Sequence, residues 1–196
     1  YLTHIKGLID ENIDDWDINK KYTNPYEFIH TNLPNFKLSI SKIKPISRAF
    51  FKLIEIYNTH NIGFEKRNMK TFHLAEGPGG FLEATAYLRK NPNDLYYGMT
   101  LINKNNDTPG WKKSDELFKK YGNIIIEKGE DKTGNLYNHN NLIYCKSCYK
   151  NSMDIITADG GFDFSLDFNK QETTVFRLIF TQVAYAITMQ KHNGHF

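Results

Sequence analysis

The chain has 196 residues, of which 40% are hydrophobic and 24% charged, as in a globular domain with one sizeable core. No apolar run reaches the roughly 18–20 residues of a membrane-spanning helix, and the first residues do not build a secretory signal peptide. The formal net charge of +3 permits an acidic partner without requiring one. We therefore expect an intracellular protein with no membrane association.

The first 44 residues are predicted to form short helices, which Asn24-Pro25 and Leu33-Pro34 interrupt. From Pro45 the sequence PISRAFFKLIEIYNTHN spaces its apolar residues along one helical face and places a proline at the helix start. We therefore expect an N-terminal helical extension, residues 1–44, followed by a second domain, residues 45–196.

Strand and helix patterns alternate through the second domain. The predicted strands are 71–75, 94–101, 123–127 and 153–159, and the predicted helices are 81–89, 114–121 and 172–190. Asn193-Gly194 is predicted to stop the last helix, so that residues 195–196 open a fifth strand. This alternation indicates an α/β fold with a mostly parallel sheet covered on both faces. In such folds ligands bind at the carboxyl ends of the strands, where the strand order reverses.

Two cysteines, Cys145 and Cys148, form one Cys-x-x-Cys in a Lys- and Asn-rich stretch that we interpret as a loop. A structural zinc site needs four ligands, and no second cysteine pair exists. We therefore expect no metal site.

A glycine-rich turn follows the first predicted strand, in the sequence EGPGGF that begins at Glu76. Glycine adopts positive φ and lets a ligand approach the backbone, whereas proline stiffens a turn. A plain strand-to-helix turn is the alternative interpretation. Three glycines in four positions, directly behind an acid at a strand end, favour a ligand site.

The type of ligand follows from what the turn lacks. The dinucleotide fingerprint needs a third glycine where this chain has Leu82, Pro78 offers no N–H to a phosphate, and no phosphate-loop pattern is present. These departures disfavour an NAD-dependent oxidoreductase. A ligand with a cationic group would suit Glu76, and S-adenosylmethionine (AdoMet) carries both a sulfonium and an α-amino group.

EGPGGF resembles motif I of the FtsJ-like (RrmJ-type) AdoMet-dependent ribose 2′-O-methyltransferases, in particular the cap-methylating branch with its cellular and large-DNA-virus members. Three further stretches agree in order and spacing: SRAFFKL at 47–53, YGMTL at 97–101 and TADGGFDFS at 157–165. The resemblance covers residues 45–196. It implies a doubly wound, Rossmann-like fold, AdoMet as cofactor, and methyl transfer to RNA riboses near the 5′ cap of mRNA.

The resemblance also implies roles for individual residues. Of the family's catalytic Lys-Asp-Lys-Glu tetrad, Lys52 would be the first lysine and Asp159 the aspartate, and Arg48 would meet RNA phosphates. The second lysine and the glutamate would lie beyond Phe196, so we expect the domain's C-terminal strands to be missing from this chain. The cofactor would contact Glu76, Gly77, Pro78, Gly79, Gly80, Phe81, Thr100, Leu101, Asp131 and Asn135.

Several alternatives remain open. Lys52 lies off the apolar stripe of its predicted helix and could be an ordinary surface lysine, while Asp159 could merely cap a loop. Within the family, ribosomal or transfer RNA could replace capped mRNA as the partner. A catalytically inactive module that binds RNA or another capping enzyme is a further possibility. The expected location is the cytoplasm, including a viral factory or virion, or the nucleus.

Overall fold

The computed structural model describes residues 1–12, 15, 19, 22–33, 36–62, 65–102, 110–161 and 171–196. Pro34, in the second predicted helix break, and residues 162–165 of the TADGGFDFS stretch lie outside the described residues. The chain forms two compact units, Tyr1–Lys44 and Pro45–Phe196.

Within its described residues the first unit contains short helical segments. These include α1 (Leu2–Asp10) and the 3-10 helix η1 (Pro25–Ile29), which begins at the proline of the first predicted break. After η1 the chain turns back, and the backbone N–H of Ile40 donates to the carbonyl of Phe28 at 3.0 Å.

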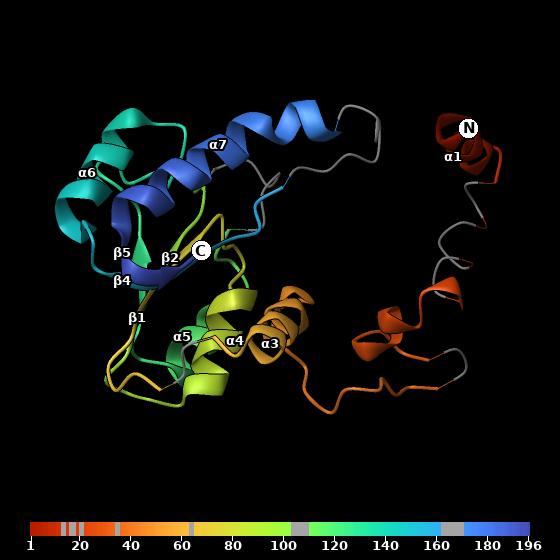
Figure 1. The fold of residues 1–196 in the computed structure, drawn as a ribbon. Helices are drawn as coiled ribbons and strands as arrows, with labels where there is room; N and C mark the ends of the chain where they lie inside the picture. Colours follow the sequence, from red (N-terminus) through yellow and green to blue (C-terminus); the bar gives the residue numbers. More distant parts are fainter. Residues whose placement is uncertain are drawn as a thin grey trace. The chain divides into compact units, whose positions relative to one another are not determined.

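A five-stranded, fully parallel sheet forms the centre of the second unit (Figure 1). Its strands are β1 (Lys70–Leu74), β2 (Leu95–Met99), β3 (Ile124–Glu127), β4 (Met153–Ala158) and β5 (Gln190–His195). The order across the sheet is β3-β2-β1-β4-β5, so the direction of winding reverses between β1 and β4. The predicted α/β fold is confirmed, and its ligand site is expected at the carboxyl ends of β1 and β4.

Helices cover both faces of this sheet (Figure 1). On one face lie α3 (Ala49–His60), α4 (Gly80–Arg89) and α5 (Asp115–Lys120), and on the other lie α6 (His139–Tyr149) and α7 (Gln171–Met189). Alternate residues of β1 and its flanks serve the two layers, because successive side chains of a strand point to opposite faces. Phe72 packs in the cluster under α6 and α7, whereas Met69 packs with α3 and α4.

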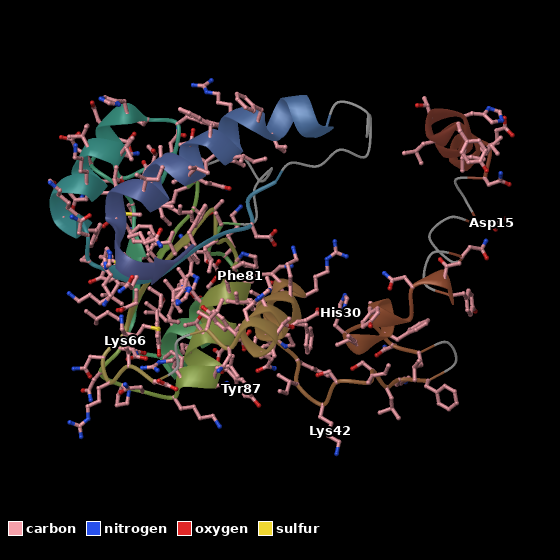
Figure 2. All side chains as sticks on the ribbon, viewed as in Figure 1. Asp15, His30, Lys42, Lys66, Phe81 and Tyr87 are labelled. Carbon is pink, nitrogen blue, oxygen red and sulfur yellow. The ribbon has the colours of Figure 1, made fainter. Side chains whose placement is uncertain are left out.

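The helix predicted from Pro45 begins later, at Ala49, with Arg48 as its N-cap residue. Its buried face is the one that the apolar spacing indicates and includes Phe50. The Phe50 ring meets that of Tyr87 on α4, with ring centroids 5.5 Å apart; Tyr87 and Phe81 mark α4 in Figure 2. The start of α3 lies beside the start of α4, because a Cβ at Gly80 would lie 3.0 Å from the Ala49 Cβ and 3.2 Å from the Phe50 backbone nitrogen.

The Cys-x-x-Cys stretch was wrongly interpreted as a loop. It lies in α6, whose cap residue Asn138 accepts a hydrogen bond from the Asn140 N–H at 3.0 Å. Cys145 is buried and Cys148 exposed. Among the described residues no group of three or more His, Cys, Asp or Glu side chains could hold a metal ion.

The last helix, predicted over 172–190, is confirmed to within one residue at each end, but the stop signal predicted at Asn193-Gly194 and the strand start predicted at residue 195 were wrong. α7 ends at Met189 and β5 begins at Gln190, so Asn193 and Gly194 lie inside the strand. Asn193 has a φ of 59° there, and the pairing of β5 with β4 is irregular. The Gln190 side chain donates to the Gly194 carbonyl at 2.5 Å, which holds this bend within the edge strand. No helix in the described part of the chain is long and apolar enough to cross a bilayer.

Candidate active site

The carboxyl ends of β1 and β4 lie side by side and carry Glu76 and Asp159, respectively. Gly160 permits the close approach of the two segments, because a Cβ at this position would lie only 2.6 Å from the Ala75 Cβ. The same Cβ would lie 2.3 Å from Nε2 of Gln182 on α7. The two acids predicted as site residues are therefore brought to one region, between the carboxyl ends of β1 and β4, where folds of this class have their ligand crevice.

The Glu76 carboxylate caps the N-terminus of α4. Its Oε1 atom accepts the backbone N–H groups of Phe81 at 2.8 Å and Leu82 at 2.9 Å. The side chain is 7% exposed, and its Oε2 atom accepts no hydrogen bond from the described residues. One oxygen of Glu76 thus organises the turn, and the other remains available to a ligand.

Burial raises the pKa of Glu76 to about 8 from its ordinary 4.5. The two backbone N–H groups act in the opposite direction, since they favour the ionised form, while the charge of Asp159 raises the pKa further. A cation placed beside Glu76 would favour its ionised form. The predicted binding of a cationic ligand group beside Glu76 stays a prediction.

The glycines of the turn serve a purpose that the sequence did not reveal. Gly79 has a φ of 116°, and a Cβ there would lie 2.8 Å from Leu117 of α5; a Cβ at Gly80 would lie 2.2 Å from the Ser47 Oγ. At these two positions a side chain would collide with the protein itself, so the missing Cβ atoms alone do not indicate a ligand, and the predicted cofactor contacts of the Gly79 and Gly80 backbone stay predictions. The missing Cβ atoms let α3 and α5 pack against the start of α4.

Gly77 and Pro78 form the outer part of the turn and are joined by a cis peptide bond. The Pro78 carbonyl accepts a hydrogen bond from the Ser114 hydroxyl at 2.6 Å. The turn is thereby tied to the start of α5.

Lys52 and Asp159 meet at the mouth of the crevice, where the Lys52 Nζ donates to the Asp159 Oδ2. Their side chains are 53% and 44% exposed. Such an exposed pair contributes little stability, typically about 0–1 kcal/mol. Arg48, the N-cap residue of α3, is exposed and precedes Lys52 by four residues, or about one helical turn. The structure thus brings together the two residues predicted to be catalytic.

Thr100 and Leu101 follow β2 at the same edge of the sheet, the first buried and the second exposed. The loop 128–138 folds onto this strand end, since the Ile102 N–H donates to the Thr133 carbonyl at 2.7 Å. A Cβ at Gly134 would lie 2.0 Å from the Thr100 carbonyl oxygen, so the two backbones touch. The loop that carries Asp131 and Asn135 is therefore held at the carboxyl-terminal edge of the sheet, where the ligand site is expected.

Asp131 binds its own loop through both carboxylate oxygens. Its Oδ1 accepts from the Thr133 N–H and from Asn141, both at 2.9 Å, and its Oδ2 accepts from Asn138 at 2.6 Å. These donors, first the Thr133 N–H, hold the pKa of Asp131 well below its ordinary range. Asp131 stabilises the loop, and its predicted cofactor contact stays a prediction.

Asn135 is engaged in the same way, because its Oδ1 accepts the Tyr137 N–H at 2.9 Å and its carbonyl accepts Asn141 at 3.0 Å. Its predicted role at the cofactor also stays a prediction.

Two polar residues near the site escaped the sequence analysis. His73 is fully buried on β1, where Thr71 lies 2.8 Å from its Nε2 and Thr157 on β4 lies 2.7 Å from its Nδ1. Burial lowers the pKa of His73 to about 3, so the ring is neutral and joins the two strands beneath the crevice. Glu127, the last residue of β3, accepts the Gly129 N–H at 2.7 Å. An acid at a strand end was the signal for Glu76 and would have found Glu127 as well.

A sequence profile of FtsJ-like methyltransferases matches residues 45–196. The chain belongs to the FtsJ-like methyltransferase family. The resemblance on which the sequence analysis relied is thereby confirmed, and the match coincides with the second compact unit.

Three curated relatives of this FtsJ-like chain are named cap-specific mRNA (nucleoside-2′-O-)-methyltransferases. The Drosophila melanogaster methyltransferase 2 is 25% identical over 96% of this chain and 28% of its own length. The Pongo abelii methyltransferase 2 is 23% identical over 100% of this chain and 26% of its own length. The methyltransferase of Autographa californica nuclear polyhedrosis virus is 30% identical over 76% of this chain and 53% of its own length. The chain thus spans about a quarter of the first two relatives and about half of the third.

Among solved structures, a ribosomal RNA methyltransferase from Plasmodium falciparum aligns with a TM-score of 0.49 and 18% identity, over 76% of this chain and 75% of that one.

Proposed function

We propose that this domain transfers a methyl group from AdoMet to ribose 2′-hydroxyls of RNA, near the 5′ cap of messenger RNA. The observation that carries the proposal is the meeting of Lys52 and Asp159 beside Glu76, at the crevice between β1 and β4 of an FtsJ-like domain. AdoMet supplies a methyl group on a positively charged sulfur. The chain's own residues must bind it, orient the ribose and help the hydroxyl to lose its proton.

Glu76 is the residue best suited to the cationic cofactor. Its unpaired Oε2 and its burial give a cation a strong electrostatic partner, because little water screens the interaction. The backbone of Gly77 to Phe81 and the strand end at Thr100 and Leu101 would line the remainder of the cofactor site. Asp131 and Asn135 would act mainly by holding the loop 128–138 beside it.

Lys52 and Asp159 would orient the ribose. The transfer would join the hydroxyl oxygen to the methyl carbon, release the cofactor's sulfur as a neutral thioether and pass the hydroxyl proton to water. The Lys52 ammonium can donate to the hydroxyl oxygen, while Asp159 fixes the position of that ammonium. Arg48, exposed one turn before Lys52, would meet a neighbouring phosphate.

Cap specificity rests on the three relatives, all of which are named cap-specific enzymes. If the substrate is capped mRNA, the reaction takes place in the nucleus or the cytoplasm. No feature of the described crevice favours ribosomal or transfer RNA over capped mRNA.

The test incubates the intact protein with methyl-labelled AdoMet and two RNAs of the same sequence, one capped and one uncapped. We expect label on the capped RNA, and nuclease digestion should locate it on a ribose 2′-oxygen near the cap. Equal labelling of both RNAs would contradict cap specificity. Binding of AdoMet and RNA without any transfer would instead identify a binding module.

A further inference from the structure

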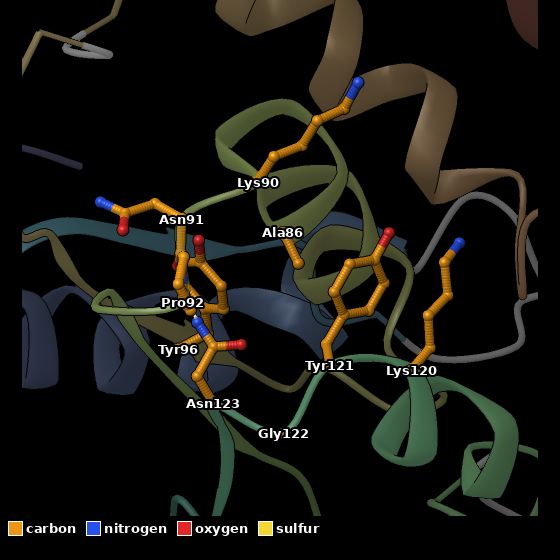
Figure 3. A pocket seen from close by; sticks show the side chains of 9 residues that line it. All are labelled: Ala86, Lys90, Asn91, Pro92, Tyr96, Lys120, Tyr121, Gly122 and Asn123. Carbon is orange, nitrogen blue, oxygen red and sulfur yellow. Dashed lines mark hydrogen bonds between the residues drawn. The ribbon is translucent and has the colours of Figure 1, made fainter.

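Figure 3 shows a cavity of about 410 Å³. Its lining residues place it at the opposite end of the sheet from Glu76 and Asp159. It is formed where α4 and α5 end and where β2 and β3 begin. The ten residues of α4 rise by about 1.5 Å each, so roughly 15 Å separate this cavity from the glycine turn at the other end of the helix. Its volume lies within the range of small-ligand sites.

Flat, largely apolar groups line the cavity. Figure 3 shows the Tyr121 ring on one side and Pro92 on the other, and the buried Tyr96 also lines the cavity. A slot between an aromatic ring and a proline suits a planar ring, because such a ligand gains stacking and loses little polar solvation.

One polar group in the cavity is held in a fixed orientation. The Asn123 Nδ2 donates to the carbonyls of Asn91 at 3.1 Å and Asp94 at 2.9 Å, so the amide oxygen is directed away from them and toward the Tyr121 side (Figure 3). The support is rigid, since the Asp94 carboxylate is itself bound by Arg89 at 2.6 Å and by the Met69 N–H at 2.7 Å. A preoriented acceptor beside a flat slot can bind an N–H or amino group on the edge of a base.

The charged groups that line the cavity are both positive. Lys90 and Lys120 are exposed, and no carboxylate belongs to the lining that the structure describes. Lys120 Nζ lies 4.9 Å from the centroid of the Tyr121 ring. The Lys90 ammonium lies at the rim of the cavity, 5.5 Å from the centroid of the Tyr87 ring on α4. One ammonium beside the slot and a second at the rim attract an anion, so the lining as a whole fits a base together with a phosphate.

We propose that this cavity is a second RNA-contact site, which takes one unpaired nucleotide of the substrate, with its base against Tyr121 and its phosphate near Lys90 and Lys120. That the nucleotide belongs to an RNA chain rests on the proposed function; the nucleotide chemistry rests on the cavity alone. The site would extend RNA binding along α4, away from the reacting ribose.

The test measures RNA binding to the intact protein by fluorescence anisotropy. Two capped RNAs are compared: a dinucleotide, and an oligonucleotide long enough to cover the roughly 15 Å length of α4. Tyr121→Leu, which keeps apolar volume but loses the ring, should weaken binding of the longer RNA about tenfold and leave the dinucleotide unaffected. Tyr121→Phe should bind both like the wild type.

The lysines provide an independent measurement. Lys90→Ala and Lys120→Ala should each weaken binding of the longer RNA. Each should also make the slope of log affinity against log salt concentration shallower by about one, the amount that one phosphate contact contributes. Lys146→Ala, which removes an exposed lysine from α6 on the other face of the sheet, is the matched control and should change neither. Thermal unfolding of each variant verifies that the fold is retained.

Unchanged binding of the longer RNA by Tyr121→Leu would overturn the proposal. So would binding of free mononucleotides that depends on Tyr121 while RNA binding does not, since this would indicate a nucleotide effector site. Tyr121-dependent RNA binding without methyl transfer would refute the proposed function and leave this site standing. Methyl transfer together with RNA binding that does not depend on Tyr121 would refute this second site and leave the proposed function standing.

Discussion

The Lys52 ammonium donates a hydrogen bond to the Asp159 carboxylate although 107 residues separate the two in the chain. The contact joins α3 to the carboxyl end of β4, at the strand reversal where α/β folds bind their ligands. Both side chains are about half exposed, so water screens their attraction. The position of this pair, rather than its strength, gives it functional meaning.

Lys52→Ala and Asp159→Ala should therefore reduce methyl transfer far more than they reduce stability. We expect the rate to fall about 100-fold or more, because an orienting contact to the hydroxyl is lost. The free energy of unfolding should change by less than about 1 kcal/mol. Rates come from labelled AdoMet and stabilities from chemical denaturation.

The matched control is Lys119→Ala, which removes one member of the exposed Glu116–Lys119 pair on α5. It should leave the rate unchanged. A wild-type rate in Lys52→Ala would refute the role assigned to that lysine.

Glu76 should make the stability of the domain depend on pH. Its pKa is about 8 in the folded state against an ordinary 4.5, so the folded state holds a proton that the unfolded chain releases between these values. The contribution of Glu76 protonation to the free energy of unfolding is therefore complete below about pH 4.5 and is lost as the pH rises through about 8. The free energy of unfolding falls by at most about 1.4 kcal/mol per pH unit in this window.

Glu76→Gln cannot titrate, so its free energy of unfolding should decline less across this window. Chemical denaturation at a series of pH values measures the difference, and exposed Glu116→Gln is the control. Parallel pH profiles for wild type and Glu76→Gln would contradict the prediction.

The same group should control cofactor affinity. A cationic ligand attracts the ionised form of Glu76, so AdoMet should bind more tightly as the pH rises toward about 8. Glu76→Gln should bind AdoMet more weakly and with a flatter pH dependence. Calorimetric titration across this range provides the measurement. An affinity that falls with rising pH in the wild type would place the cationic group elsewhere.

Much of this site could be predicted because its signals are local. The alternation of strands and helices defines the sheet edge, and an acid before a glycine turn marks Glu76. Lys52 emerged only from the family resemblance, whereas Asp159, like Glu76, is an acid at the end of a predicted strand and is followed by glycines. His73 could not be predicted as a link between strands, because its partner Thr157 lies 84 residues away.

The errors also have physical causes. The stretch that contains Cys145 lacks a clear apolar stripe, so α6 was mistaken for a loop. The purpose of Gly80 depends on Ser47, whose place beside the turn is fixed only when α3 packs on α4. Packing between elements decides such details, and the sequence of the turn alone does not contain them.

Gly80→Ala should destabilise the domain by about 1–3 kcal/mol, because its Cβ would overlap the Ser47 Oγ at 2.2 Å and crowd the Ala49 Cβ at 3.0 Å. The buried Ser47 hydroxyl has no hydrogen-bond partner among the described residues. Ser47→Ala should therefore recover part of the loss in a double variant. Gly122→Ala meets no atom within 4 Å and should have little effect. Denaturant unfolding measures all four proteins, and a Gly80→Ala variant as stable as Gly122→Ala would refute the packing role.

Arg89 and Asp94 form a buried ion pair at the amino-terminal edge of the sheet. Their side chains are 4% and 0% exposed, and Arg89 Nε donates to the Asp94 Oδ2 at 2.6 Å. Arg89→Met leaves the carboxylate without its charge partner in a site that excludes water, so the free energy of unfolding should fall by about 3–5 kcal/mol. Lys66→Met is the matched control: its side chain is 49% exposed, and its partner Asp154 retains Lys191.

The pH dependence of this loss follows from Asp94. Burial alone would raise its pKa, but hydrogen bonds from Arg89, the Met69 N–H and Tyr96 outweigh burial and hold the pKa below its ordinary 3.8. The stability that the pair contributes is therefore present above about pH 3.8 and is lost as the pH falls through the lower folded-state pKa. The gap between wild type and Arg89→Met should narrow in acid. If the two proteins differed by less than about 1 kcal/mol at neutral pH, Asp94 would have to draw its stabilisation from Met69 and Tyr96 rather than from the guanidinium.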